Sequence, residues 1–280
     1  SRGIRKASDF LMGLQLTGAY KKSSIANLQV SLPAIVIGGG LTAIDTATEL
    51  LAYYPIQIEK TAQRYRDLVR QFGDAHVRKL FDDEEWETLC AHMAHAAELD
   101  AEYGAANREG RMPRVQQLLD KWGGVTLVYR KGLGDSPAYR LNHEEVAKSL
   151  EEGVRYIEDM SPIEAVLDAR GHVKGMKFVR ADKSIVELPA RTVCVAAGTS
   201  PNITYEKEYE GTFKLDSKGR YFQSYDAAVG SDGKLSLTEC APQNGFFTSY
   251  NDGKHAVSFY GDNHAHYAGS VVKAMASGKD

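Results

Sequence analysis

The sequence predicts an α/β fold, in which short buried strands alternate with helices around a parallel sheet. The segment Ala34-Ile35-Val36-Ile37 is apolar and rich in β-branched residues, which is typical of a strand buried on both faces. A glycine run follows it directly, and residues 42–54 then carry apolar side chains at helical spacing. Later in the chain, 125–129 and 192–197 are again short apolar strands. We therefore expect a doubly wound α/β sheet.

The composition narrows the class of protein. The 280 residues are 43% hydrophobic and 25% charged, which suits one large or two modest globular domains. A formal net charge of -3 gives no basic field for nucleic acid, and the apolar runs are too short to span a bilayer. The chain opens without a charged-then-apolar leader, so we expect no secretory signal.

Cysteine usage points to a reducing compartment. The three cysteines, Cys90, Cys194 and Cys240, are widely scattered and form no CxxC pair. This spacing argues against both a redox dithiol and a zinc knuckle. Cys194 lies in an apolar strand and is expected to be a small core residue. We therefore expect a cytoplasmic protein.

The remaining elements follow from periodicity and turn residues. Pro55 is expected to end the first long helix, because proline lacks the amide donor of a helical residue. Further helices are expected over 7–16, 62–72, 83–103, 115–122, 142–150 and 270–276. Further strands are expected over 154–157 and 258–260, with a β-meander over 163–167, 173–179 and 184–188. Residues 200–251 have many glycines and few regular signals.

The glycine run has the spacing of a dinucleotide-binding loop, Gly38-x-Gly40-x-x-Ala43. The first glycine permits a tight turn, the second lets the backbone approach a pyrophosphate, and the third small residue lets the helix pack on the sheet. The helix N-terminus then offers free N–H groups to the anion. A strand before and a helix after the motif favour this interpretation over a structural glycine turn. The expected contacts are Gly38, Gly39, Gly40, Leu41, Thr42, Ala43 and Asp45.

Two segments compete to be the second strand of this unit. Residues 56–59 place an acid about 20 residues after the loop, as NAD-binding proteins do. Residues 125–129 form the better strand by length and β-branching, and they precede Arg130 and Lys131. We favour the second candidate, which makes residues 57–121 a helical insertion. The two cations then predict NADPH in preference to NADH, since they can hold a 2′-phosphate; the alternative is that both are solvated surface cations.

Four segments together carry a family resemblance. IVIGGGLTAIDTATE (35–49), VTLVYRKGLGDSPA (125–138), EEVAKSLEEGV (144–154) and VCVAAGTSPN (193–202) resemble the glutamate synthase small-subunit group. Members of that group are FAD- and NAD(P)-dependent oxidoreductases of the pyridine nucleotide-disulfide class. The resemblance implies a Rossmann-like NAD(P)H-binding domain inserted within an FAD domain, with the return marked by Ala197 and Gly198. It also implies that Arg140, after the second strand, contacts the nucleotide.

The C-terminal segment looks like the last FAD motif of the same family. Gly261 and Asp262 match its ribityl-binding pair, and Ser270 and Val271 open the helix expected to face the flavin. Without the resemblance, Gly261-Asp262 would be interpreted as a plain turn. The family's earlier FAD-binding glycine motif and its iron–sulfur cysteines have no counterpart in this chain.

The resemblance therefore implies a piece of a longer protein with three parts. Residues 1–33 would connect from the FAD domain, 34–200 would form the NAD(P)H-binding domain, and 201–280 would be a returning, partial FAD-binding domain. FAD would belong to the full-length protein and would be weakly held or absent here. The expected partners are the missing FAD-domain segment and a redox partner or iron–sulfur domain, with a homo-oligomer as a further option.

Several histidines raise other options. His92, His95 and Glu98 fall on one face of a predicted helix, but no further metal ligand is evident, and a solvated face is the preferred interpretation. His264 and His266 are expected at the surface. No hydrolase arrangement of nucleophile and base has positional support. The favoured function is therefore the NADPH-binding portion of a flavin oxidoreductase, and the alternative is a non-catalytic nucleotide-binding or sensing module.

Overall fold

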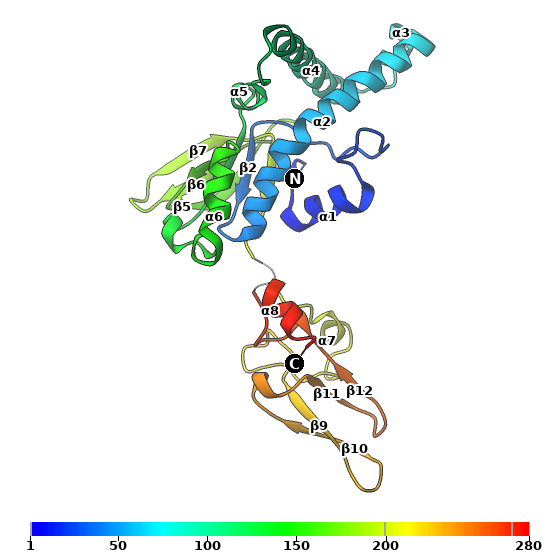
Figure 1. The fold of residues 1–280 in the computed structure, drawn as a ribbon, viewed down its shortest axis with the longest axis vertical. Coiled ribbons are helices and arrows are strands. Elements are labelled where there is room, and N and C mark those ends of the chain that lie inside the picture. Colours follow the sequence, from blue (N-terminus) through cyan, green and yellow to red (C-terminus); the bar gives the residue numbers. More distant parts are fainter. Residues whose placement is uncertain (1, 199, 270, 280) are drawn as a thin grey trace. The chain divides into compact units, whose positions relative to one another are not determined.

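The computed structural model describes residues 2–198, 200–269 and 271–279. It divides into two compact units, Ser1–Gly198 and Thr199–Asp280, which Figure 1 shows along the chain from blue to red. The first unit holds two sheets and the second unit one, and each unit has its own buried apolar side chains. The expected α/β fold is confirmed in the first unit.

The first unit is built on a five-stranded, fully parallel sheet. Its strands lie in the order β1 (Ile4–Lys6), β8 (Thr192–Val195), β2 (Ala34–Ile37), β3 (Val125–Val128) and β4 (Arg155–Ile157). From β2 the chain proceeds outward through β3 to β4, and it then returns to the other side of β2 as β8. The direction of winding therefore reverses between β2 and β8, which makes that point a topological switch point.

Two different layers cover the sheet. Val36 and Leu127 face a helical layer of α1 (Ala7–Thr17), α2 (Leu41–Phe72) and α6 (Pro137–Glu151). On the opposite face, Ile35 and Ile37 pack against the antiparallel meander. Its strands are β5 (Met160–Leu167), β6 (Val173–Arg180) and β7 (Ile185–Pro189).

The meander corrects the expectation of a doubly wound sheet, which has helices on both faces. Strand β2 is buried along its whole length, as a two-sided apolar strand must be. However, an apolar strand face packs equally well against strands, and Val173, Met176 and Phe178 of β6 fill that side. The β-meander itself was expected and is confirmed.

The first 33 residues were expected to connect from another domain. In the structure, β1 pairs in parallel with β8, and α1 buries Phe10 and Leu14 in the helical layer. Residues 4–17 therefore contribute an edge strand and a packed helix to the first unit.

The prediction that Pro55 ends the first helix is wrong. Helix α2 continues through Pro55 to Phe72, and so it contains the rejected strand candidate 56–59. Proline removes one helical hydrogen bond, at a cost of about 3 kcal/mol. Burial on both sides of it offsets this cost, because Tyr53, Tyr54 and Ile58 are all at most 1% exposed.

The expected helical insertion is confirmed, and it starts as an extension of α2. It continues through α3 (Asp74–Arg78), α4 (Asp83–Glu109) and α5 (Val115–Lys121). A reciprocal capping box between Asp82 and Glu85 begins α4, which packs back on α2. The chain then enters β3, as the preferred choice of second strand requires.

The second unit is a small antiparallel sheet with short helices. Its strands lie in the order β10 (Leu235–Glu239), β9 (Tyr225–Val229), β11 (Phe247–Asn251) and β12 (Ala256–Ser258). Helices α7 (Thr204–Glu208) and α8 (Val271–Ala276) and the 3-10 turns η2 (Pro242–Asn244) and η3 (Gly261–Asn263) complete it.

Residues 200–251 are therefore more regular than their sequence suggests. Strands β9 and β10 carry mostly exposed and half-buried side chains, so their apolar pattern is weak. The last strand ends at Ser258 rather than spanning 258–260, because Phe259 turns into a core formed with Ile203 and Phe222.

Candidate functional site

The glycine loop lies at the switch point of the parallel sheet. It follows β2, where the Gly38 N–H donates to the Val128 carbonyl at 3.1 Å. On the other side, the Ala196 N–H donates to the Ile37 carbonyl at 2.7 Å. The carboxyl ends of β2, β3 and β8 thus surround the loop, at the place where open α/β sheets bind ligands.

Gly38 and Gly40 are required for different physical reasons. A Cβ atom on Gly38 would lie 2.4 Å from the Ala196 carbonyl oxygen, so close approach of the backbone to the segment after β8 requires glycine. A Cβ atom on Gly40 would meet nothing within 4 Å. Gly40 therefore faces open space, where a ligand can approach its backbone. Ala43 is fully buried, as expected for the small residue that packs the helix on the sheet.

Helix α2 directs its N-terminus at this open space. Gly40 is its N-cap and provides no side-chain cap. The Gly40 carbonyl accepts hydrogen bonds from the N–H groups of Ala43 and Ile44. No described residue accepts a hydrogen bond from the N–H groups of Leu41 or Thr42. These free donors, with the positive end of the helix dipole, can bind an anion.

A second loop lies beside the first one. Residues 129–136, which we call the cation loop, lead from β3 through the 3-10 turn η1 (Leu133–Asp135) into α6. The Ala138 N–H donates to the Gly39 carbonyl at 3.1 Å, and the Tyr129 ring lies against Gly39. This contact was not predicted from the sequence. Ser136-Pro137 is the local signal for the start of α6, because Ser136 caps the helix and Pro137 occupies its first turn.

Three cations lie within a few residues of this contact along the chain. Arg130, Lys131 and Arg140 are all exposed, and none forms a salt bridge within the described part of the chain. Arg130 and Lys131 belong to the cation loop, and Arg140 lies in the first turns of α6. They therefore keep their charge available for an anionic ligand.

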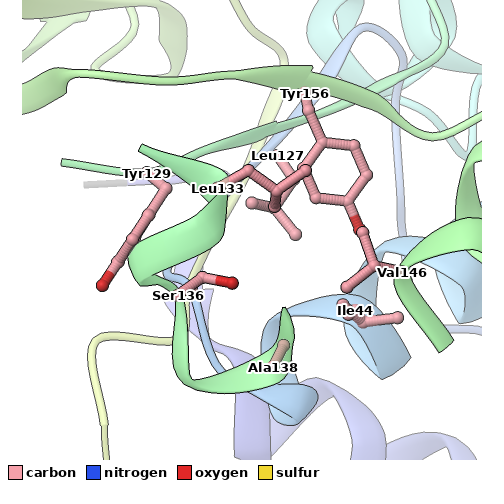
Figure 2. Close-up of a pocket in the computed structure, with 9 residues that line it drawn as sticks. Ile44, Leu127, Tyr129, Leu133, Ser136, Ala138, Val146 and Tyr156 are labelled. Carbon is pink, nitrogen blue, oxygen red and sulfur yellow. The ribbon is translucent and has the colours of Figure 1, made fainter. Parts of the chain in front are cut away.

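A small apolar cavity lies under the cation loop. Figure 2 shows Leu133, Leu127 and Tyr156 on one side of it and Ile44 and Val146 on the other. The Tyr156 hydroxyl is 2.7 Å from the Ser149 hydroxyl of α6. These contacts anchor the underside of the cation loop, and Tyr129, whose ring lies against Gly39, also lines the cavity (Figure 2).

Asp45 has an acidic charge of α6 close to it rather than a cation. Desolvation, and then the negative charge of Glu145, raise the pKa of Asp45, although its side chain is exposed. Glu49, one turn further along α2, also has a raised pKa, from burial and then from Asp45. The structure thus places Asp45 in an acidic row, which does not favour a phosphate at its side chain.

The remaining predicted site residues fall into two groups. Ala197 and Gly198 follow β8 and are exposed beside the loop, since Ala196 contacts Gly38; the Gly198 φ of 99° favours glycine. Gly261, Asp262 and Val271 belong to the second unit. There the Gly269 N–H donates to the Asp262 carboxylate at 3.2 Å, just before α8 begins at Val271. Ser270 lies outside the described residues.

The expectation of a solvated face at His92, His95 and Glu98 is wrong. His92 is 4% exposed, and its Nε2 lies 3.1 Å from the Val30 carbonyl oxygen. His95 stacks on Trp122 and bonds the Tyr54 hydroxyl, while Glu98 accepts a hydrogen bond from Trp122. This face of α4 packs against α2 and α5, which the local sequence does not reveal. Among the described residues, no group of three or more His, Cys, Asp or Glu side chains could hold a metal ion.

His264 is a further correction. It is fully buried, its Nε2 bonds the Gly245 carbonyl at 2.8 Å, and it stacks on Phe259. His266 is exposed, as expected. Cys194 is a buried core residue, as predicted, and burial raises the pKa of its thiol to about 11.

Comparisons with known proteins give one curated relative of appreciable identity. No protein-family model matches this chain. The chain is 34% identical over 252 residues to "Uncharacterized protein RP006" of Rickettsia prowazekii (strain Madrid E). The match covers 82% of this chain and 33% of the relative, so the chain spans about a third of that protein's length.

Among the solved structures that match this chain, two are similar over nearly its whole length. They are thioredoxin reductase of T. acidophilum, at 15% identity and a TM-score of 0.46, and that of Lactococcus lactis, at 11% and 0.41. Each match covers 99% of this chain, and 54% and 55% of those chains respectively. No described helix combines the length and the apolar character needed to cross a membrane.

Proposed function

We propose that this chain is the NADPH-binding portion of a flavin-dependent oxidoreductase of the glutamate synthase small-subunit type. One observation carries the proposal: an open glycine loop at the switch point of a parallel sheet is hydrogen-bonded to the segment that carries three exposed cations, none of which forms a salt bridge within the described residues. The proposed location is the cytoplasm, in keeping with three free cysteines.

The loop accounts for the diphosphate of the nucleotide. Gly40 leaves room for it, and the N–H groups of Leu41 and Thr42 supply donors without reorganisation. The Ala138–Gly39 hydrogen bond brings the cation loop alongside, on the side of β3. That is the side on which the second strand of a dinucleotide-binding unit holds the adenosine ribose.

The three cations account for the 2′-phosphate. Arg130, Lys131 and Arg140 have no acidic partner within the described residues, so each can form a charge-assisted hydrogen bond with it. NADH lacks this phosphate, and the proposal therefore includes a preference for NADPH.

The flavin part of the proposal rests on the resemblance. In the second unit, Asp262 is exposed and bonds Gly269 next to the start of α8, which fits a loop that could accept a ribityl hydroxyl. FAD, when bound in the full-length protein, would accept hydride from NADPH and pass electrons to another domain or partner. The residues of this chain would bind and orient the nucleotide. We propose that the chain alone holds FAD weakly or not at all.

Calorimetry with NADPH and NADH tests the proposal. We expect wild type to bind NADPH more tightly than NADH. Arg130→Glu should weaken NADPH at least tenfold with little effect on NADH, because it removes one charge-assisted bond worth about 1.5–3 kcal/mol. Lys174→Glu is the matched control, since Lys174 is an exposed cation of β6. Equal affinities for both nucleotides, unchanged by Arg130→Glu, would overturn the assignment of the phosphate site.

A second experiment separates an oxidoreductase from a sensing module. The full-length protein that contains this chain should oxidise NADPH when FAD and ferricyanide are present. NADPH binding without any oxidation would favour the non-catalytic alternative. Visible absorbance of the purified chain reports its own flavin content, and one equivalent of tightly bound FAD would contradict weak retention.

A further inference from the structure

Hydrogen bonds join the cation loop to the turn between β4 and β5. The Tyr129 N–H donates to the Ile157 carbonyl at 2.9 Å, and the Met160 N–H donates to the Tyr129 carbonyl at 3.1 Å. These two bonds tie Tyr129 to the last residue of β4 and to the first residue of β5, on either side of the turn. They fix the start of the cation loop at Tyr129, one residue before Arg130.

Two further bonds fix the loop beyond Arg130. The Asp159 N–H donates to the Lys131 carbonyl at 3.3 Å, and the Leu133 N–H donates to the Glu158 carboxylate at 2.7 Å. The second bond is the shorter one and has a charged acceptor, so it is the stronger of the two. Its acceptor is the Glu158 side chain, so a substitution of Glu158 can remove this bond.

The turn that carries Glu158 is itself constrained. Asp159 has a φ of 55°, in the left-handed region that residues other than glycine seldom adopt. Two hydrogen bonds hold it there: the Asp159 N–H donates to the Lys131 carbonyl, and the N–H of the next residue, Met160, donates to the Tyr129 carbonyl. Glu158 is thus presented to Leu133 from a turn of fixed conformation.

The charge of Glu158 and its hydrogen bond have opposite effects on the affinity of the cation loop for a phosphate. Its negative charge lies across from the loop that carries Arg130 and Lys131, so it opposes binding of a further anion. Glu158 forms no salt bridge with either cation within the described part of the chain, and its Oε1 accepts from the Leu133 amide instead. The bond therefore orders the loop without occupying its cations.

We propose that Glu158 is a positioning residue for NADPH selectivity: its carboxylate holds the Leu133 amide and so fixes the cation loop with Arg130 and Lys131 directed to the 2′-phosphate. This inference rests on the proposed function, since it assumes that the cation loop binds that phosphate. Ordering the loop before binding lowers the entropy cost of forming the charged contacts.

Two substitutions separate the hydrogen bond from the charge. Glu158→Gln removes the charge and keeps a carbonyl oxygen that can accept from the Leu133 amide. Glu158→Ala removes both. Glu187→Ala is the matched control, because Glu187 is an exposed carboxylate of β7 in the same unit.

Calorimetry should give the ratio of NADH to NADPH dissociation constants for each variant. We expect this ratio to be about fivefold lower in Glu158→Ala than in Glu158→Gln, as expected for one hydrogen bond. Glu158→Gln and Glu187→Ala should keep the ratio at or above the wild-type value. A Glu158→Ala ratio equal to that of Glu158→Gln would overturn the inference.

Amide hydrogen exchange distinguishes this failure from failure of the proposed function. The Leu133 amide should exchange faster in Glu158→Ala than in Glu158→Gln, whether or not nucleotide is present. Faster exchange in a protein that shows no NADPH preference would refute the phosphate site while confirming the contact. Equal exchange in the two variants would refute the contact itself.

Discussion

Gly40→Ala separates a glycine needed for ligand binding from one needed for folding. Gly40 has φ -97° and ψ 173°, which any residue adopts, and an added Cβ meets no atom within 4 Å. Alanine is a poorer N-cap than glycine, but it also lowers the entropy of the unfolded chain. These effects oppose each other, so the free energy of unfolding should change by less than about 1 kcal/mol.

The effect on nucleotide binding should be much larger. The new methyl group would occupy the space through which a diphosphate reaches the N–H groups of Leu41 and Thr42. Loss of one charge-assisted hydrogen bond costs about 1.5–3 kcal/mol, which is roughly a tenfold to hundredfold loss of affinity. Because the diphosphate is common to both nucleotides, NADPH and NADH should weaken together, unlike the selective loss expected of Arg130→Glu.

Calorimetry and urea unfolding on the same samples provide the assay. Gly38→Ala is the control: its Cβ would lie 2.4 Å from the Ala196 carbonyl oxygen, so it should destabilise the protein by about 1–3 kcal/mol. A folded Gly40→Ala variant that binds both nucleotides with wild-type affinity would refute the reasoning.

Three further predictions concern stability and reactivity. Burial lowers the pKa of His92 to about 4, below the 6.5 of an unfolded histidine, so the unfolded chain binds the extra proton between these values. The free energy of unfolding should therefore fall by on the order of 3 kcal/mol as the pH drops from 6.5 toward 4. Urea titrations at several pH values should show that this free energy depends less steeply on pH in His92→Gln than in wild type. Equal slopes would contradict the prediction. Exposed Cys90 should react with a thiol reagent in the native protein and buried Cys194 only after unfolding, so rapid native labelling of Cys194 would argue against its burial. Pro55→Ala should restore a helical hydrogen bond in α2 and raise the free energy of unfolding by about 1–3 kcal/mol, and a lowered value would show that the ring packs favourably.

The sequence alone predicted the elements that depend on neighbouring residues. The loop at Gly38–Ala43 follows from glycine spacing between a strand and a helix, and the structure places it at the carboxyl end of β2. The choice of 125–129 as second strand is confirmed, and so are the helical insertion and the meander. Each has a period or a turn signal within a short window, which is why it could be identified.

Tertiary structure decided what depends on distant partners. The meander covers a sheet face that local pattern assigned to helices, because an apolar strand face does not specify what packs on it. His92 and His264 are buried through contacts with Val30 and Gly245, far from them in the chain. The surroundings of the glycine loop also depend on tertiary structure. Only the fold brings the Ala138 amide to Gly39, and with it the cation loop. Spacing predicts a phosphate loop, but the cations proposed to select its ligand follow another strand, β3, and their position depends on how the sheet is assembled.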